Sequence, residues 1–250
     1  MVIYLEVKIK MSIEKVTRLI KGANNITVLT GAGISTESGI PDFRSRTGIY
    51  SSNPLDILSI QYFEKHPKEF WDFMKQYLNW TNVEPNVGHK ILAKWEQKGY
   101  VKNIITQNID GLHQKAGSQN VLQVHGTMAT ATCEGCFRKY NMDFVMKQGE
   151  PYKCIGCGDP YVRPDVILFG ETVDASTEAF KIAKTTDLLL VLGTSLQVYP
   201  VASIPKKIRY NGHTVIINYM ETDFDYRRNT TKISAGIGDT LTEIDKLLED

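Results

Sequence analysis

Short apolar runs rich in Val, Ile and Leu alternate along the chain with longer segments in which apolar residues recur every three or four positions. The runs are typical of buried strands, and the recurring positions are typical of helices that pack on one face. The predicted strands are Ile26–Thr30, Val101–Thr106, Val121–Val124, Val166–Phe169, Leu188–Gly193 and Thr214–Asn218. Because strands and helices alternate, the pattern predicts an α/β fold with a Rossmann-like parallel sheet covered by helices.

The helices are predicted from apolar spacing and from residues that start or end a helix. Ser12 is suited to cap a helix that carries Ile13, Val16 and Ile20 on one face and ends near Gly22. The other predicted helices are one rich in aromatic core residues that opens at Pro67, and those at Val87–Gln97, Asp174–Lys184, Val201–Arg209 and Thr240–Glu249.

The charge balance narrows the class of protein. The 250 residues include 29 Lys and Arg against 28 Asp and Glu, which argues against a nucleic-acid binder because such proteins carry a basic excess. The longest apolar run, Leu188–Leu192, is far shorter than the ~20 residues that cross a bilayer. Glu6 and Lys8 interrupt the stretch that a signal peptide needs. We therefore expect a cytoplasmic protein with no membrane segment and no direct contact with nucleic acid.

All four cysteines fall in one pattern, C-x2-C-x17-C-x2-C, formed by Cys133, Cys136, Cys154 and Cys157. This spacing is typical of a four-thiolate zinc ribbon, and four thiolates leave no open position on the ion, so the zinc would be structural. Two disulfides are the alternative, which the absence of a secretion signal disfavours. A zinc-ribbon nucleic-acid module is a second alternative, although the basic residues around the cysteines are balanced by acidic ones.

The zinc ribbon lies between predicted strands of the sheet, so it is expected to be an insertion. We predict a Rossmann-like domain from residues 1–44, 85–127 and 163–250. The helical insertion at 45–84 and the zinc-ribbon insertion at 128–162 are expected to form the smaller domain.

A glycine-rich turn, Gly31-Ala32-Gly33-Ile34-Ser35-Thr36, follows the first predicted strand. Such a turn can bring backbone N–H groups to a pyrophosphate. As a dinucleotide fingerprint it is incomplete, since Thr36 replaces the third glycine and no acidic residue ends a second strand about 20 residues later. Alone it leaves nucleotide binding and a purely structural turn open. The loop that follows carries Asp42, Phe43 and Arg44, and a buried core rarely contains charged residues such as Asp42 and Arg44.

Polar groups also follow the other predicted strands. Ligands bind at the carboxyl ends of strands in open α/β sheets, so these groups are expected to meet in one crevice. His125 follows one strand and is a candidate general base, because histidine titrates near ~6.5. The remaining strand ends contribute Gln107, Asn108 and Asp110, then Gly193, Thr194 and Ser195, and finally Asn218.

Six segments in order resemble the sirtuin family of NAD-dependent protein deacylases, in the compact form of its prokaryotic and archaeal members. These segments are Gly31–Arg44, Thr106–His113, His125-Gly126, the two Cys-x2-Cys pairs, Arg163–Glu171 and Gly193–Ser195. The resemblance extends from about residue 12 to the C-terminus. It implies a deacetylase that transfers the acetyl group of acetyl-lysine to ADP-ribose and releases nicotinamide and O-acetyl-ADP-ribose.

The resemblance also implies which residues hold NAD+, the co-substrate. His125 and Asn108 would be catalytic. The cofactor would contact Gly31, Ala32, Gly33, Thr36, Phe43, Arg44, Gln107, Asn108, Ile109, Asp110, His125, Gly193, Thr194, Ser195 and Asn218, and Ile237 or Asp239 would contact the adenine.

Protein substrates are implied in the same way. The peptide would bind as an added strand along Ile167, Phe169, Gly170, Glu171 and Val198. Relatives that prefer acidic acyl groups carry a Tyr-x2-Arg pair where this chain has Met74 and Tyr77, which predicts a neutral acyl group. Lysine-rich DNA-packaging proteins are candidate substrates, and a monomer is expected.

Other activities remain open at this stage. Within the family, the alternative is transfer of a single ADP-ribose to a protein. Outside it, the alternatives are a Rossmann dehydrogenase, disfavoured by the incomplete fingerprint, and the zinc-ribbon nucleic-acid module.

Overall fold

The central feature of the computed structural model is a six-stranded parallel sheet with strand order β3-β2-β1-β7-β8-β9. The structure describes residues 2–51, 56–80, 82–150 and 152–249. The strands are β1 (Ile26–Thr30), β2 (Val101–Thr106), β3 (Val121–Gln123), β7 (Leu188–Leu192), β8 (His213–Ile217) and β9 (Thr230–Ile233). The chain builds outward from β1 in one direction and from β7 in the other, so the strand order reverses between them. This reversal is the point at which doubly wound sheets bind ligands.

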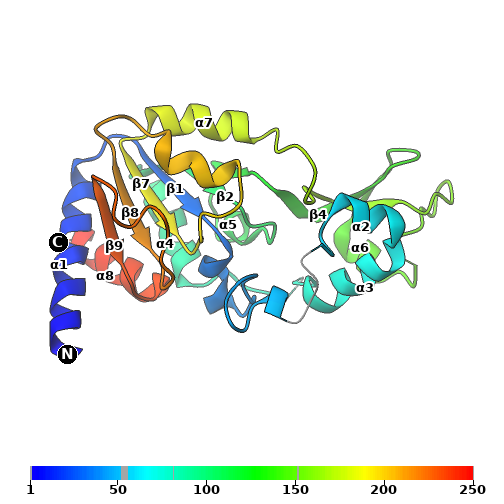
Figure 1. Cartoon of the computed structure of the whole chain (residues 1–250), viewed down its shortest axis with the longest axis horizontal. Coiled ribbons are helices and arrows are strands. Elements are labelled where there is room, and N and C mark those ends of the chain that lie inside the picture. The colour runs from blue at the N-terminus through cyan, green and yellow to red at the C-terminus, as the bar shows by residue number, and fades with distance from the viewer. Residues whose placement is uncertain (1, 52–55, 81, 151, 250) are drawn as a thin grey trace.

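Helices cover both faces of this sheet, as Figure 1 shows. The helices α1 (Val2–Gly22), α4 (Val87–Gln97) and α8 (Ile237–Glu249) lie on one face, and α7 (Ser176–Thr185) with the 3-10 helix η3 (Val201–Lys206) on the other. Adjacent residues of β7 point to opposite faces, Leu190 to the first and Leu189 to the second. This double burial explains why the strand sequences are continuously apolar.

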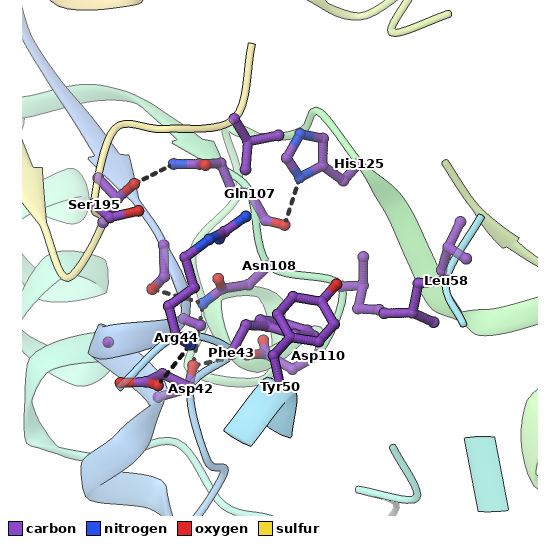
Figure 2. Close-up of a pocket in the computed structure, with 18 of the residues that line it drawn as sticks. Asp42, Phe43, Arg44, Tyr50, Leu58, Gln107, Asn108, Asp110, His125 and Ser195 are labelled. Atoms are coloured by element: carbon purple, nitrogen blue, oxygen red, sulfur yellow. Dashed lines mark hydrogen bonds between the residues drawn. The ribbon is translucent and has the colours of Figure 1, made fainter. Parts of the chain in front are cut away.

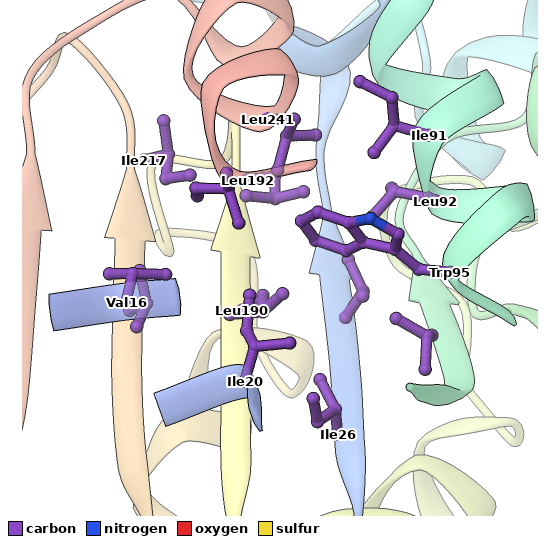
Figure 3. Close-up of a cluster of buried hydrophobic side chains, with 14 of the residues drawn as sticks. Val16, Ile20, Ile26, Ile91, Leu92, Trp95, Leu190, Leu192, Ile217 and Leu241 are labelled. Atoms are coloured by element: carbon purple, nitrogen blue, oxygen red, sulfur yellow. The ribbon is translucent and has the colours of Figure 1, made fainter. Parts of the chain in front are cut away.

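Side chains from α1, α4 and α8 interlock over the first face of the sheet (Figure 3). Val16 of α1 and Trp95 of α4 are fully buried against Leu190. The Trp95 indole also donates a hydrogen bond of 2.9 Å to Asp245 of α8, which satisfies its buried N–H.

A second, smaller unit contains a three-stranded antiparallel sheet of order β5-β4-β6. Its elements are β4 (Gly126–Cys133), β5 (Lys139–Asn141), β6 (Val162–Val166), α2 (Ile60–Lys65), α3 (Pro67–Tyr77) and α6 (Met142–Met146). The predicted aromatic helix is α3, and Phe70 and Trp71 are fully buried in the core that it shares with the strands. The Trp71 indole donates to the Val162 carbonyl at 2.8 Å. Three short helices complete the described elements: η1 (Ala32–Ser38), η2 (Ile49–Ser51) and α5 (Leu112–Lys115).

Several predicted elements are wrong. The predicted strand Val166–Phe169 is not part of the parallel sheet, because β6 ends at Val166 and pairs antiparallel with β4. Ser12 does not cap a helix, since α1 begins at Val2 and the Ser12 hydroxyl donates to the Lys8 carbonyl within it. The short strands β5 and β9 were not predicted. Among the described residues, the structure contains no helix long and apolar enough to cross a membrane.

Candidate active site

A cleft of about 260 Å³ lies between the carboxyl ends of the parallel strands and the smaller unit. It brings together most of the residues that the sequence singled out. The predicted residues that line it are Gly31, Ala32, Gly33, Phe43, Arg44, Gln107, Asn108, Ile109, Asp110, His125, Ile167, Phe169, Gly170, Glu171, Gly193, Thr194, Ser195, Val198 and Asn218.

Three predicted residues do not line the cleft. Thr36 is exposed, and its hydroxyl donates to the Gly33 carbonyl. Ile237 is buried in the core under the sheet, and Asp239 lies in the first turn of α8. The structure therefore does not bring the two predicted adenine contacts to the cleft.

The glycines of the cleft allow two loops to touch at the strand reversal. Gly33 donates a backbone hydrogen bond of 2.9 Å to the Gly193 carbonyl. A Cβ on Gly193 would lie 2.4 Å from the Ile34 nitrogen, and its φ of 62° is unfavourable for other residues. Only glycines let the loops after β1 and β7 approach this closely, and the cleft floor is therefore bare backbone, as a pyrophosphate site requires.

Hydrogen bonds fix the polar side chains after β2. Gln107 donates to the Thr194 hydroxyl at 2.8 Å, which ties the end of β2 to the loop after β7. The Asn108 amide donates to the Gly31 carbonyl and to the Ser35 hydroxyl, both at 3.2 Å. Neither bond uses the Asn108 Oδ1 atom. Both amides are thus held in one orientation at the strand reversal.

His125 lies at the upper rim of the cleft in Figure 2. Its Nδ1 is 3.1 Å from the Gln107 carbonyl, and a carbonyl only accepts, so Nδ1 carries the proton and Nε2 is the free base. Burial lowers the pKa of His125 below its ordinary value, and the Gln107 hydrogen bond opposes this only in part. The imidazole is therefore neutral at pH 7 and able to take a proton.

Asp110 is the buried carboxyl of the cleft. The Ser35 hydroxyl donates to one carboxyl oxygen at 2.7 Å, and the Leu112 N–H donates to the other at 2.9 Å. Burial raises the pKa of Asp110, and these two hydrogen bonds reduce the shift. Ser35, whose hydroxyl joins Asn108 to Asp110, was not among the predicted site residues.

The loop after η1 forms one wall of the cleft. Asp42 accepts hydrogen bonds from the backbone N–H groups of Arg44 and Ser45, and the Phe43 ring lies 5.4 Å from the Tyr50 ring (Figure 2). Met74, where relatives that prefer acidic acyl groups carry a tyrosine, lies in the apolar part of this wall. The other apolar residues of the wall were not predicted; they are Tyr50, Leu58, Leu78 and Trp80.

The edge of the cleft at residues 166–171 is held by main-chain hydrogen bonds. Ile167 donates to the His125 carbonyl, and Phe169 donates to the Leu58 carbonyl, both at 2.9 Å. The Ile167 and Phe169 side chains are partly exposed. This segment therefore joins the catalytic candidate His125 to the start of α2.

Two histidines are buried behind the cleft. The rings of His89 and His113 lie 4.9 Å apart, and His113 contacts the Thr30 hydroxyl at 3.0 Å. Burial lowers the pKa of His89 to about 4, and burial with the charge of His89 lowers the pKa of His113 to about 3. Both rings are neutral in the folded protein at pH 7.

These two histidines are expected to make the fold acid-sensitive. Unfolded histidine titrates near ~6.5, so the unfolded state takes up protons first as the pH falls. The free energy of unfolding should drop by about 1.4 kcal/mol per histidine for each pH unit between about 6.5 and the folded pKa. Denaturant unfolding from pH 7 to pH 5 measures this drop. The idea fails if NMR shows the His89 and His113 rings titrating near the ordinary pKa of histidine.

The four cysteines form a second candidate site, in the smaller unit. All four sulfur atoms lie within 4.8 Å of one another, and the distances Cys133 Sγ to Cys157 Sγ and Cys136 Sγ to Cys154 Sγ are both 3.7 Å. A tetrahedral zinc with Zn–S of roughly 2.3 Å places its sulfurs about 3.8 Å apart. The Tyr140 hydroxyl lies 2.9 Å from Cys154 Sγ and can donate to a thiolate. The residues therefore fit one structural Zn²⁺.

Known sequences resemble this chain over most of its length. The model of the Sir2 family matches residues 31–200. The chain is 43% identical over 245 residues to NAD-dependent protein deacetylase 2 of Geobacillus kaustophilus, a match that covers 95% of this chain and 98% of the relative. It is 44% identical over 221 residues to the NAD-dependent protein deacetylase of Saccharolobus solfataricus, which covers 86% and 89% of the two chains.

Solved structures agree with these relatives. A Sir2 enzyme with a deacetylated p53 peptide and 3′-O-acetyl-ADP-ribose superimposes with a TM-score of 0.89 at 36% identity, over 94% of this chain and 97% of the other. A Sir2 complex with p53 peptide and NAD+ gives 0.85 at 38% identity, over 93% and 97%. The pattern match and the 43% identity over nearly the whole chain lead to one conclusion: the chain belongs to the Sir2 family.

Proposed function

We propose that this protein is an NAD-dependent protein lysine deacetylase, which forms O-acetyl-ADP-ribose and releases nicotinamide and the free lysine. The observation that carries the proposal is a neutral His125 whose Nε2 is free, in one cleft with the two glycine loops at the strand reversal. Curated relatives carry the same activity in their names. A nucleic-acid module does not account for such a base in this cleft, and the incomplete glycine fingerprint, with Thr36 in place of the third glycine, disfavours the Rossmann dehydrogenase.

The cleft holds groups suited to the phosphates and to the nicotinamide end of NAD+. The bare backbone of Gly31, Gly33 and Gly193 suits the phosphates, and Asn218 lies beside them on the adenosine side. The Asn108 and Asp110 side chains suit the nicotinamide end, where the Asp110 carboxyl can accept from the carboxamide. When bound, NAD+ supplies an electrophilic ribose C1′ and the leaving group nicotinamide.

The side chains of the cleft then have separate tasks. His125 Nε2 takes the proton of a ribose hydroxyl, because Nδ1 already donates to Gln107. Both amide hydrogens of Asn108 are used within the protein, so its free Oδ1 is the atom that orients the nicotinamide end of NAD+. Phe43 covers the site and excludes water.

The substrate is a protein or peptide that carries a neutral acyl-lysine. Apolar side chains of Leu58, Leu78 and Trp80 face the cleft, and they favour an acetyl group over an unmodified ammonium, which is costly to desolvate. Val198 and Phe169 both line the cleft, and we propose that an extended peptide binds between them. We further propose lysine-rich DNA-packaging proteins as substrates, a monomeric enzyme and a cytoplasmic location.

The test is the dependence of NAD+ cleavage on acetylation. Purified protein is given NAD+ labelled in its ADP-ribose part, with an acetyl-lysine peptide or with the same peptide unmodified. Free nicotinamide and labelled O-acetyl-ADP-ribose should form only with the acetylated peptide. Label attached to protein would identify an ADP-ribosyltransferase instead, and NADH absorbance with an alcohol substrate would identify a dehydrogenase.

A further inference from the structure

Arg163 has an unusual position for a charged residue of the smaller unit. It lies in β6, directly opposite Thr132 of β4, and the next pair along is Val162 opposite the zinc-site residue Cys133. Its side chain is only 15% exposed, and its guanidinium lies 6.0 Å from the centre of the buried Phe63 ring. The guanidinium of Arg163 therefore lies against the core of the smaller unit and not in solvent.

The guanidinium binds both ends of the segment that edges the cleft. It donates to both carboxylate oxygens of Glu171, at 2.8 and 2.7 Å, and to the Val166 carbonyl at 2.9 Å. Glu171 in turn accepts from the Leu168 N–H at 2.7 Å. Arg163 therefore holds both ends of residues 166–171, and Glu171 holds the middle through Leu168.

The hydrogen bonds to Arg163 and Leu168 keep Glu171 ionised and hold it in place. Burial alone would raise its pKa, but the hydrogen bonds from Arg163 and Leu168 and the positive charge of Arg163 lower it overall. Both of its oxygens are engaged within the protein. Glu171 therefore lines the cleft as a support for the segment.

The segment is anchored on its other side as well. Phe169 uses both of its main-chain groups, donating to Leu58 at 2.9 Å and accepting from Ile60 at 3.0 Å. Among the residues that the structure describes, no protein group binds the Ile167 carbonyl or the Gly170 main chain. These are the main-chain groups left to pair with an added peptide strand.

We propose that Arg163 is the positioning residue for substrate peptides: it holds residues 166–171 so that the main chain of Ile167 and Gly170 meets the acyl-peptide. The inference rests on the proposed deacetylase function. It also links the ribbon to catalysis, because β6 carries Arg163 on the strand that pairs with the zinc-site residue Cys133.

Stability alone does not explain this pair. Burying two charges costs about as much free energy as their attraction returns, and an apolar pair of similar size is often as stable. A two-point guanidinium–carboxylate contact does provide fixed geometry, which lysine cannot reproduce. The geometry of the segment is therefore the feature that the pair supplies.

The experiment compares Arg163→Lys and Glu171→Gln with Glu178→Gln, which removes an exposed ion pair with Lys181. We call the Arg163–Glu171 pair the clamp. Arg163→Lys and Glu171→Gln should each raise the KM for an acetyl-lysine peptide by about tenfold or more, the size expected for one lost charge-assisted hydrogen bond. The KM for NAD+ and the zinc content should stay unchanged. Arg163→Lys with Glu171→Gln should be little worse than either change alone, and Glu178→Gln should match the wild type.

Hydrogen exchange of the protein without ligands tests the clamp separately from the proposed function. The Leu168 amide should exchange faster in Arg163→Lys and Glu171→Gln, because its acceptor moves. Unchanged Leu168 exchange or an unchanged peptide KM would overturn the inference, as would an equal rise in KM for NAD+ and peptide. If the wild-type protein fails to bind the acetylated peptide in calorimetry, the proposed function fails, whatever the exchange data show.

Discussion

His125→Ala is expected to lower the turnover of an acetyl-lysine peptide by ~10²–10⁴-fold, the usual contribution of a general base. His125 is the one imidazole among the described residues that line the cleft. His89 and His113 are buried, with pKa values of about 4 and about 3, and neither lines the cleft. No second imidazole in the described lining of the cleft can replace it.

The same variant should still exchange nicotinamide. We propose that the acyl oxygen of the substrate displaces nicotinamide from the ribose C1′ before His125 takes the proton of a ribose hydroxyl, so exchange of labelled nicotinamide into NAD+ does not need His125. Wild-type turnover should fall on the acidic side with a pKa below the ordinary value of histidine, because burial lowers the pKa of His125. His66→Ala, at an exposed position, is the matched control. Near-normal deacetylation by His125→Ala would remove the residue from the mechanism.

Cys154→Ser is expected to abolish zinc binding and to unfold the smaller unit. Cys154 is 2% exposed and belongs to the same buried core as Trp71 of α3. In small zinc units the free energy of metal binding is free energy of folding, so the loss is not confined to the ribbon. Metal analysis should find no zinc, and thermal unfolding should show an early transition that the wild type lacks.

A graded control is available at the same sulfur. Tyr140→Phe removes only the hydroxyl that lies 2.9 Å from Cys154 Sγ. Loss of such an outer partner typically weakens metal binding by about 10–100-fold, so this variant should retain zinc until challenged with a chelator. A Cys154→Ser protein with wild-type stability, or a wild-type protein that binds no zinc, would show that the cysteines serve another purpose.

The parallel sheet and most of the cleft could be predicted because their signals are local. Leu188–Leu192 is apolar throughout since it is buried on both faces, and the polar residues after it mark the carboxyl end of a strand. The strands of a parallel sheet share this edge, so His125 and Thr194 were expected in one crevice although they are far apart in the chain. The structure places both there.

The missed features depend on contacts between distant segments. Leu78 and Trp80 line the cleft, but apolar residues in a helical segment look the same whether they face a cavity or a core. Val166–Phe169 has the composition of a strand, yet β6 pairs with β4 of the ribbon, and the chain after Val166 runs along the cleft. Ser35 reaches Asp110 only through the fold, since 75 positions separate them.

The core of the smaller unit has a consequence for how the chain folds during synthesis. Trp71 is covered by β6 and bonds the Val162 carbonyl, 91 positions later. A growing chain therefore exposes the aromatic face of α3 until the ribbon has been made, and contacts of such long sequence separation form slowly. Nascent chains that stop between Trp71 and Val162 expose an apolar surface that can aggregate. A chaperone that binds apolar segments is expected to act on the chain at this stage of synthesis.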